Sequence, residues 1–481
     1  MDDHASETSL ALFSPITLPC GRQLPNRLVK VALYEHLANL RGGPPNSYHN
    51  ALYSRWAQGG WGMVLTGNVQ VSGEHLSLGR DTVIPPVVTE ASLKPFKELA
   101  SSMHGSSPLA EAERGTSPLA IMQLSHGGRQ SPNLIGGRFP FASPLGPSSI
   151  RVGSSVQHGS FLGNAFYRFL FQEPKPMTLD QISDVVAAFV RGARLAAQAG
   201  FDGVQIHAAH GYLLAQFLSP KSNTRTDEYA CDNALQLVRR IVDNIRLEVP
   251  ESFVVGIKLN VADYTDTTGT SPADRALAHI TSIAAWGTVD FIELSGGDYE
   301  DVAFMNKPQS AESSDSPRQA LFTQCAHDAM RSLEGIERNS EQKLPLILLT
   351  GGFRTPAQMH AALSAHHTDL IGIGRSAIVC TDLPKRLRSD IDANTEAVCQ
   401  QPAVETRVVK PTNRLSNWLW SKIPKVKLVG SGVEVAWYEL ALRRIAEAVV
   451  SSADGEATPE FDFDLGNTKI LVGMWLWRAP R

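Results

Sequence analysis

The chain has 481 residues, 43% of them hydrophobic and 19% charged, an ordinary globular composition for one large core or a barrel with an appendage. Its formal net charge at pH 7 is −4, and no stretch is rich in Lys and Arg, which argues against a nucleic-acid partner. The five cysteines are scattered without a C-x-x-C pair, which argues against zinc, an iron–sulfur cluster or a disulfide framework.

The N-terminal stretch predicts no secretory signal. Its first ten residues, MDDHASETSL, include neither the basic region nor the apolar region of a signal peptide. No run of about 18 apolar residues occurs, so we also expect no transmembrane segment. Together with the scattered thiols, these features predict a cytoplasmic protein.

Short apolar runs alternate with segments of helical periodicity along most of the chain. The segment 179–198 shows the helical pattern most clearly, with apolar side chains recurring at Ile182, Val185 and Phe189. Its start is indicated by Thr178–Asp180, and it ends at Gly200, a residue typical of helix ends. The expected helices include Ser47–Gln58, Leu179–Gln198, Asn233–Leu247, Pro272–Trp286 and Pro356–Leu363. The expected strands are Leu28–Ala32, Met63–Thr66, Leu119–Leu124, Gly203–His207, Phe253–Leu259, Val289–Leu294, Leu344–Thr350 and Asp369–Ile373.

Strands that alternate with helices imply a parallel sheet. A doubly wound sheet usually has fewer strands than the eight expected here, and no G-x-G-x-x-G turn follows the first strand. We therefore predict an α/β fold, a (β/α)8 TIM barrel over residues 1–394, enlarged by insertions beyond the usual size of about 250 residues.

Three irregular segments interrupt this alternation. Two long excursions, Ser125–Met177 and Ser295–Lys343, leave the carboxyl ends of the third and sixth strands, the face where barrel active sites lie. The piece Ser101–Pro118, rich in Ser, Gly and Pro, enters the third strand from the opposite face, so we expect a disordered insertion there.

Residues 395–481 form a predicted C-terminal extension that is rich in tryptophan. Such aromatic residues are typical of a covering packed against the barrel, of a subunit interface in a homo-oligomer, or of an element at a membrane surface. We expect the covering, and the other two roles stay open. The extension holds five of the eight tryptophans, Trp418, Trp420, Trp437, Trp475 and Trp477.

The segment QIHAAHGYLLAQFLSP begins inside the fourth strand and carries two histidines and a tyrosine to the active-site rim. His207 and His210 can each present a ring N–H to a bound oxygen, and Tyr212 can present a phenol. Two donors beside a weak acid suit enone reduction, because the donors polarise the carbonyl while the acid protonates the α-carbon. A phenol with a pKa of about 10 keeps its proton at neutral pH and can still deliver it.

Other roles for the two histidines stay open on these residues alone. A His-x-x-His pair can bind a metal, but no nearby Cys, Asp or Glu completes a set of three or four ligands, so we predict no metal site. Both histidines could also be structural residues of the rim.

The seventh and eighth strands end in the sequences TGGFR and GIGR. Gly351, Gly352 and Gly374 permit close approach of the backbone to an anion, and Arg375 supplies a bidentate partner. Barrel phosphate sites commonly use these two loops, so the pair predicts a phosphate-binding site, although a single Gly–Gly pair is often only a turn.

The longer stretch HAAHGYLLAQFLSPKSNTRTD, residues 207–227, resembles the strand-four signature of the Old Yellow Enzyme family of FMN-containing ene-reductases. The resemblance extends from Leu12 to Arg375 and includes NRLV in strand one, GGWG before strand two and QLSHGGR after strand three. It implies FMN as cofactor, NAD(P)H as co-substrate and a small α,β-unsaturated carbonyl compound as substrate. Phe171–Pro176 and the Trp-rich tail are most similar to fungal members, many of which serve secondary metabolism.

Carried over by position, the resemblance implies roles for individual side chains. His207 and His210 would bind the substrate carbonyl above the flavin, and Tyr212 would be the proton donor. Gln123 would hydrogen-bond the pyrimidine edge of FMN. Lys258 falls where the family usually has an arginine, and a cation there would stabilise the anionic reduced flavin. Lysine lacks the planar fork of arginine, and a barrel-mouth lysine paired with a carboxylate is the alternative.

Two residues depart from the family pattern. Tyr34 occupies a position where relatives commonly have Thr or Cys beside flavin O4, so its ring is expected to crowd the pocket or move the flavin. Ser125 replaces a bulky tryptophan of some relatives and would enlarge the substrate site. The remaining flavin contacts are assigned to Ala32, Leu33, Tyr34 and Gly67 around the ring, and to Gly351, Gly352, Gly374 and Arg375 around the phosphate.

The sequence therefore predicts an FMN-dependent NAD(P)H oxidoreductase that reduces the activated C=C bond of an α,β-unsaturated carbonyl compound. An FMN-dependent isomerase or oxidase of a biosynthetic intermediate is the alternative among enzymes. A flavin-binding protein without turnover is the alternative among binding proteins.

Overall fold

The computed structural model describes residues 11–105, 117–153, 161–261, 271–295, 317–337, 343–392 without 352 and 354, and 427–480 without 453–456, 458, 463, 464 and 466. Gly352, Trp418 and Trp420 lie outside these ranges, as do most of the excursion Ser295–Lys343 and residues 106–116 of the predicted insertion.

Eight parallel strands form a closed barrel, so the predicted (β/α)8 TIM barrel is confirmed. Each strand pairs with its neighbours in chain order, and the pairing of the last strand with the first, at Ile371 with Leu28, closes the ring. The strands are β3 (Leu28–Lys30), β4 (Met63–Gln70), β6 (Leu119–Ser125), β9 (Gly203–Ala208), β10 (Val254–Asn260), β11 (Phe291–Ser295), β12 (Leu346–Thr350) and β13 (Leu370–Ile373).

One strand runs well past its predicted end. The apolar run from Met63 predicts a strand that stops at Thr66, whereas β4 continues to Gln70. Its extra residues pair with β6 and with the short edge strand β5 (Thr82–Val83), after a shift of register between Leu65 and Asn68. The partners of this second half are strand residues far away in the sequence, so the local pattern around Met63 does not reveal them.

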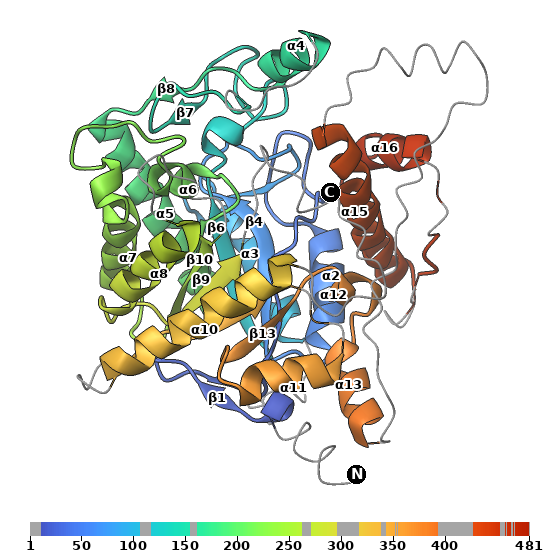
Figure 1. Ribbon diagram of the computed structural model, residues 1–481. Helices are drawn as coiled ribbons and strands as arrows, with labels where there is room; N and C mark the ends of the chain where they lie inside the picture. The colour runs from blue at the N-terminus through green and yellow to red at the C-terminus, as the bar shows by residue number, and fades with distance from the viewer. Residues whose placement is uncertain are drawn as a thin grey trace.

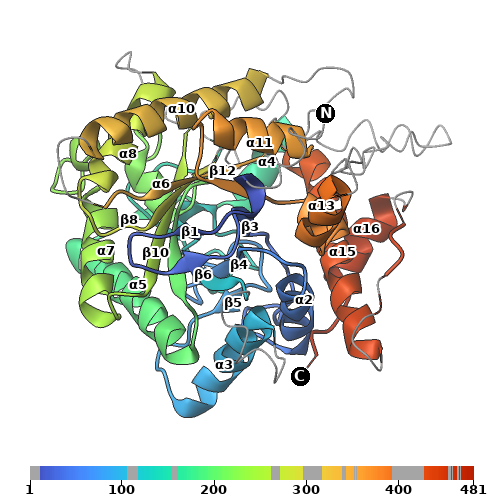
Figure 2. The same cartoon turned by 90° about the horizontal axis from the view of Figure 1, so that it is seen from below.

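Helices surround the strands, as Figures 1 and 2 show from the side and from below. The predicted start and end of α5 are confirmed. The Thr178 side chain caps its N-terminus by accepting from the Gln181 N–H, and Gly200, with φ 91°, ends the helix. The helices of the barrel are α2 (Ser47–Ala57), α3 (Glu90–His104), α5 (Leu179–Ala199), α7 (Gln236–Glu248), α8 (Pro272–Ala284), α10 (Pro317–Glu337), α11 (Pro356–Ser364), α12 (Ser376–Val379) and α13 (Leu383–Asp392).

The start of the predicted disordered insertion is helical. Residues 101–104 belong to the last turn of α3, and Leu99 and Met103 are buried in the core. The Ser-rich composition suggested a loop, but apolar residues one helical turn apart hold this part of the segment against the barrel.

The lower half of the barrel is a packed apolar plug. The antiparallel hairpin of β1 (Ile16–Thr17) and β2 (Gln23–Leu24) covers the amino ends of the strands, as Figure 2 shows. Leu24 joins the inward residues Leu65 and Phe291 in one buried cluster. Because this end is filled and covered, a ligand site has to lie at the carboxyl ends of the strands.

The excursion after β6 crosses the upper rim in Figure 1. It contains the short helix η2 (Gly128–Gln130), the helix α4 (Phe161–Leu170) and two short parallel strands, β7 (Leu145–Gly146) and β8 (Lys175–Pro176).

The described part of the C-terminal segment packs on the side of the barrel. Its helices α15 (Lys427–Ser451) and α16 (Asn467–Trp475) contact each other, and α15 lies along α2 in both ribbon views. The tail is tied to the loop after β4, because the Arg80 guanidinium donates to the carbonyls of Trp475 (3.4 Å) and Trp477 (2.7 Å). The division into a barrel of residues 1–394 and an extension of residues 395–481 stays a prediction.

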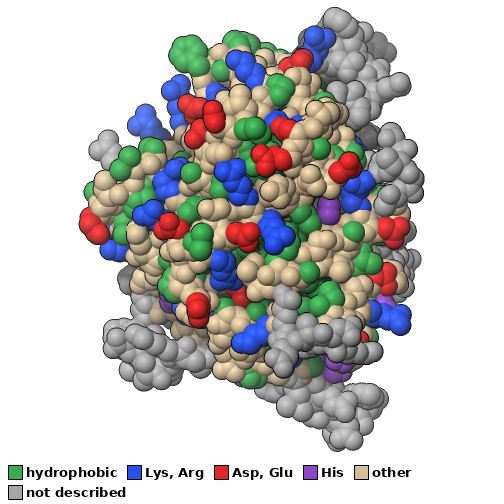
Figure 3. All heavy atoms as spheres, turned by 90° about the vertical axis from the view of Figure 1, so that its left-hand side faces the viewer, with side chains coloured by type: hydrophobic (Ala, Val, Ile, Leu, Met, Phe, Trp, Pro, Cys, Tyr) green, Lys and Arg blue, Asp and Glu red, His purple; other side chains and the backbone are tan. Residues whose placement is uncertain are grey.

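The surface carries charges of both signs. On the face in Figure 3, the described Lys and Arg side chains are interspersed with Asp and Glu side chains. Within the described ranges, no helix has the length and apolar character needed to cross a bilayer.

We expect the C-terminal segment to be needed for solubility, because its helix α15 buries Trp437, Leu440, Leu442 and Ile445. Leu442→Asp places an unpaired charge there and should lower the free energy of unfolding by more than about 3 kcal/mol. Val450→Asp, on the same helix but 51% exposed, is the matched control for thermal unfolding.

Deletion of residues 395–481 should likewise expose apolar surface and cause aggregation, measured by light scattering. A truncated protein that stays in solution and loses only liposome binding would instead indicate a membrane-surface element. If the truncated protein stays in solution with full activity, and the full-length protein never bound liposomes, both the covering role and the membrane role are contradicted.

Candidate active site

The carboxyl ends of the strands bring polar side chains from five of them to one rim. Asn68, Gln123, His207, Lys258 and Glu293 come from β4, β6, β9, β10 and β11, and none is more than 7% exposed. A polar layer above an apolar plug is what a polar ligand at the barrel mouth requires.

The two histidines are held in different ways. Burial lowers the pKa of His207 well below its usual value, so the ring is neutral at working pH. Its Nδ1 accepts from the Ala209 N–H at 3.2 Å, which leaves the ring proton on Nε2 as a donor. His210 adopts φ 57°, and its Nε2 lies 2.8 Å from Ser295 Oγ. The Gln130 amide holds this turn by donating to the His210 carbonyl at 2.7 Å.

Tyr212 lies against His207, with ring centroids 4.9 Å apart in an edge-to-face arrangement. The rings of His207 and His210 are 5.0 Å apart, so the three predicted catalytic side chains form one cluster. The Asn68 amide donates to the Tyr212 oxygen at 3.1 Å. A donor at that oxygen stabilises the phenolate that forms when the phenol gives up its proton.

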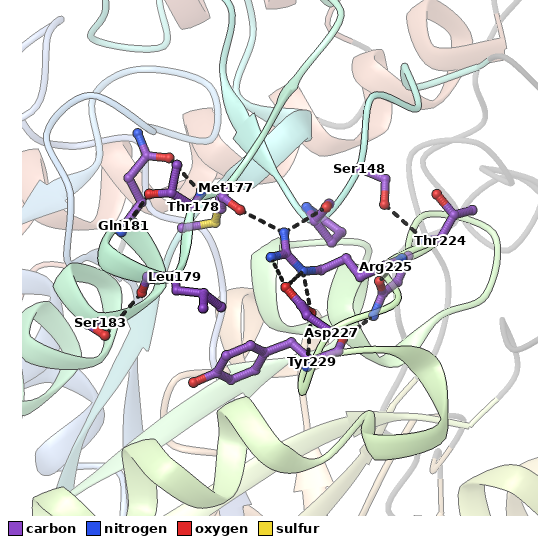
Figure 4. Close-up of polar contacts among 12 residues, drawn as sticks. Ser148, Met177, Thr178, Leu179, Gln181, Ser183, Thr224, Arg225, Asp227 and Tyr229 are labelled. Atoms are coloured by element: carbon purple, nitrogen blue, oxygen red, sulfur yellow. Dashed lines mark hydrogen bonds and ion pairs between the residues drawn. The ribbon is translucent and has the colours of Figure 1, made fainter.

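A clamp holds the loop that follows these residues, as Figure 4 shows. The Arg225 guanidinium donates to the carbonyls of Pro147 (3.2 Å) and Met177 (2.7 Å), in the middle and at the end of the excursion after β6. It also pairs with Asp227, with Nε 3.0 Å from Oδ1. The loops after β6 and β9 are therefore locked together above the rim.

Gln123 and Lys258 belong to one hydrogen-bond network inside the barrel. The Gln123 amide donates to Gln205 Oε1 at 2.6 Å, and the Gln205 amide donates to Glu293 Oε2 at 2.8 Å. Lys258 Nζ lies 2.9 Å from Glu293 Oε1, so this lysine is paired with a carboxylate, and a flavin contact in addition to that pairing stays a prediction. The pairing does not remove the cation from the rim.

The loop after β3 lies against β4 through Gly67. The Gly67 N–H donates to Glu35 Oε1 at 2.8 Å, and a Cβ at Gly67 would lie 2.2 Å from the Leu33 carbonyl oxygen. Only glycine permits this approach. Tyr34 donates its hydroxyl to the Gly79 carbonyl, and Ala32 is half-buried beside the apolar plug.

The predicted phosphate loops leave open backbone at the ends of β12 and β13. A Cβ at Gly351 would meet nothing within 4 Å, and at Gly374 the nearest atoms would be 3.8 Å away. The Arg375 guanidinium follows directly and lies 5.9 Å from the centre of the Tyr438 ring of α15. The open glycine backbone and the Arg375 guanidinium fit the phosphate end of FMN. The Gln123 amide and the Lys258 ammonium group fit its pyrimidine end.

Some residues of the site carry weak signals in the sequence. Glu293 is a single charge in the buried strand FIELS, and Gln205 stands two residues before His207, on the same face of β9. Asn68 lies beyond the predicted end of its strand.

Ser125, which was expected to enlarge the substrate site, is fully buried, and its hydroxyl has no hydrogen-bond partner among the described residues. Within the same ranges, no three His, Cys, Asp or Glu side chains gather as metal ligands would.

Comparisons with known proteins identify the family of the chain. The sequence profile of the NADH:flavin oxidoreductase / NADH oxidase family matches residues 11–394. The chain is 34% identical over 443 residues to the NADH-dependent flavin oxidoreductase iccE of Talaromyces variabilis, a match that covers 91% of this chain and 99% of that protein. It is 38% identical over 376 residues to the NADH-dependent flavin oxidoreductase iliE of Neonectria sp. (strain DH2). That match covers 77% of this chain and 46% of the relative, so it spans about half of the relative's length.

Solved structures share the fold. An Old Yellow Enzyme homologue from Zymomonas mobilis superposes with a TM-score of 0.58 at 22% identity, over 79% of this chain and 93% of that chain. A 2-naphthoyl-CoA reductase in complex with 2-naphthoyl-CoA superposes with a TM-score of 0.61 at 19% identity, over 81% of this chain and 54% of that chain.

Proposed function

The chain belongs to the NADH:flavin oxidoreductase / NADH oxidase family, the family of Old Yellow Enzyme, and on this premise we propose that it is an FMN-dependent ene-reductase. It is a flavin-dependent oxidoreductase that uses NAD(P)H. The proposal adds that its flavin is FMN and that its oxidising substrate is an α,β-unsaturated carbonyl compound. Since the similar relatives from Talaromyces and Neonectria are fungal proteins, we place the natural substrate in fungal secondary metabolism.

One observation carries this proposal: the cluster of His207, His210 and Tyr212 at the rim. The Nε2–H of His207 is the donor that a developing enolate oxygen needs, and His210 supplies a second ring nitrogen at the same place. The Tyr212 phenol carries a proton that it can give to the α-carbon, and the Asn68 amide, which donates to the phenol oxygen, would stabilise the phenolate left behind. A retained phenol favours reduction, since reduction of a C=C bond needs a proton for the α-carbon.

FMN, when bound, would supply hydride transfer between NAD(P)H and the β-carbon of the substrate. Gln123 and Lys258 would bind its pyrimidine edge, where the ammonium group stabilises the negative charge of the reduced ring. The backbone of Ala32, Leu33, Tyr34 and Gly67 would line the ring. The phosphate would be held by Gly351, Gly352, Gly374 and Arg375.

The absorption spectrum of the purified protein tests this function directly. We expect a flavin spectrum that bleaches on addition of NADPH or NADH under argon and returns on addition of an enone. Steady-state consumption of NAD(P)H should depend on the enone. Bleaching without reoxidation by enones would favour an isomerase or oxidase, and a preparation that folds but takes up no FMN would contradict the proposal.

We expect Arg375→Ala to lower the affinity for FMN more than it lowers the thermal stability of the barrel. A charge-assisted bond to a phosphate contributes on the order of 1.5 to 3 kcal/mol, which corresponds to a loss of affinity of roughly tenfold or more. Titration of the apoprotein with FMN, followed by flavin fluorescence, measures this loss. Reduced folding with undiminished affinity would show that Arg375 only packs on Tyr438.

A further inference from the structure

Glu293 is a buried carboxylate that the proposed reaction does not use. It is the only charged residue of β11, its exposed fraction is zero, and it lies between three donors. These are Lys258 Nζ at 2.9 Å, the Gln205 amide at 2.8 Å and the Thr350 hydroxyl at 3.0 Å. The bond to Gln205 runs from β9 to β11 past the intervening β10, so it lies inside the barrel.

The carboxylate sets the direction of the two amides that it reaches. An ionised carboxylate only accepts hydrogen bonds, so Gln205 has to turn its NH2 group toward Glu293 and its carbonyl oxygen toward Gln123. Gln123 in turn has to direct its NH2 group to that oxygen, at 2.6 Å. We call the two bonds from Gln123 to Gln205 and from Gln205 to Glu293 the amide relay. The carbonyl oxygen of Gln123 takes no part in it and is the acceptor left for a ligand.

The same carboxylate sets the charge at the rim. Lys258 and Glu293 are 5% and 0% exposed at their side chains, so water screens their charges little. With both groups ionised the pair is neutral. Removal of the carboxylate alone would leave one uncompensated cation beside the Gln123 amide.

We propose that Glu293 is a positioning residue, which sets the orientation of the Gln123 amide and the net charge at the pyrimidine edge of the flavin without touching it. The inference rests on the proposed function only in that a flavin binds between Gln123 and Lys258. An oriented acceptor recognises the N–H of the pyrimidine ring. A neutral pair stabilises the reduced anionic ring less than a bare cation would, and so keeps the flavin a strong reductant.

Glu293→Gln tests both effects together, because it keeps the shape of the side chain and removes its charge. An amide at position 293 both donates and accepts, so the orientation of Gln205 and Gln123 is no longer set, and Lys258 is uncompensated. We expect the ratio of reduced to oxidised flavin at a given potential to rise about tenfold, which is about 30 mV for a two-electron couple. The affinity for FMN should fall severalfold.

Two further variants divide the proposal into its parts. Gln205→Met breaks the amide relay and keeps the ion pair, so FMN affinity should fall while the potential stays within a few millivolts of the parent. The double variant Lys258→Gln with Glu293→Gln has no net charge at these two positions, as the ion pair of the parent has none, so its potential should stay near the parent value. A marked fall in the double variant would show that Lys258 acts alone and would overturn the charge role. Because the double variant leaves no unpaired buried charge, we expect it to fold. It therefore still tests the charge role if Glu293→Gln does not fold.

Asp290→Asn is the matched control. Asp290 is a buried carboxylate immediately before the same strand, paired with Arg246 at 2.6 Å, but it lies at the opposite end of the barrel beside Cys20. We expect it to lower thermal stability and leave the flavin potential unchanged. The potential is measured by dye-equilibrated reduction, and affinity by titration of the apoprotein with FMN.

The outcomes separate this inference from the proposed function. A parent protein that binds no FMN contradicts the proposed function itself. A parent that binds FMN and reduces enones, with an unchanged or lower potential in Glu293→Gln, overturns the inference and leaves the function standing. Equal shifts in Glu293→Gln and Asp290→Asn would also overturn it, since they would reflect a general loss of stability.

Discussion

Replacement of Tyr212 by Phe is expected to slow the oxidation of reduced flavin by an enone by a factor on the order of 10² to 10⁴, the usual contribution of a positioned general acid. Reduction of the flavin by NAD(P)H should be nearly unchanged. The variant keeps the aromatic ring against His207, at 4.9 Å between centroids, and removes only the hydroxyl that accepts from Asn68. Packing and carbonyl binding should therefore survive, and only the proton transfer should be lost.

Rapid-mixing measurement of the two half-reactions distinguishes this loss from general damage. Tyr229→Phe is the matched control, because Tyr229 is also buried but its hydroxyl accepts from Arg240 at 2.6 Å, away from the rim. Its two half-reactions should both resemble those of the parent. If Tyr212→Phe reoxidises with an enone as quickly as the parent, Tyr212 is not the acid, and the isomerase or oxidase becomes the better assignment.

Replacement of both His207 and His210 by Ala is expected to abolish the long-wavelength band that a bound phenol produces, and to slow enone reduction by more than about 10²-fold. Removal of a single oxyanion donor typically lowers the rate by about 10² to 10³.

Because burial lowers the pKa of His207 well below its usual value, its ring stays neutral as the pH falls through the ordinary histidine range. The Nε2–H donor should therefore persist, and phenol binding should show no loss attributable to His207 between about pH 6 and 8.

Titration with a phenol at several pH values, followed by absorption, measures this effect. His279→Ala is the control, since His279 is a buried histidine on α8 with a pKa lowered to about 4 by burial, and is not part of the rim cluster. Undiminished phenol binding in the double variant would restore the alternative that both histidines are structural residues.

Local sequence was sufficient for the barrel and for the proximity of His207, His210 and Tyr212. The strand and helix periods are properties of short segments, and a parallel arrangement of eight such units has few solutions other than closure. His207, His210 and Tyr212 lie within six residues at the end of one strand, so the chain itself keeps them together. The capped helix from Thr178 to Gly200 was predictable for the same reason.

Tertiary structure alone decided which distant residues meet at the rim. Asn68 is 144 positions from Tyr212, and Gln205 is 88 positions from Glu293. Their contacts depend on the register of a closed barrel and on a shift in β4, which no periodicity within a strand encodes. The packing of α15 on α2 is likewise a contact between distant surfaces. A charged residue in a buried strand, such as Glu293, indicates in the sequence that a partner must exist, but only closure of the barrel selects Lys258 and Gln205 as those partners.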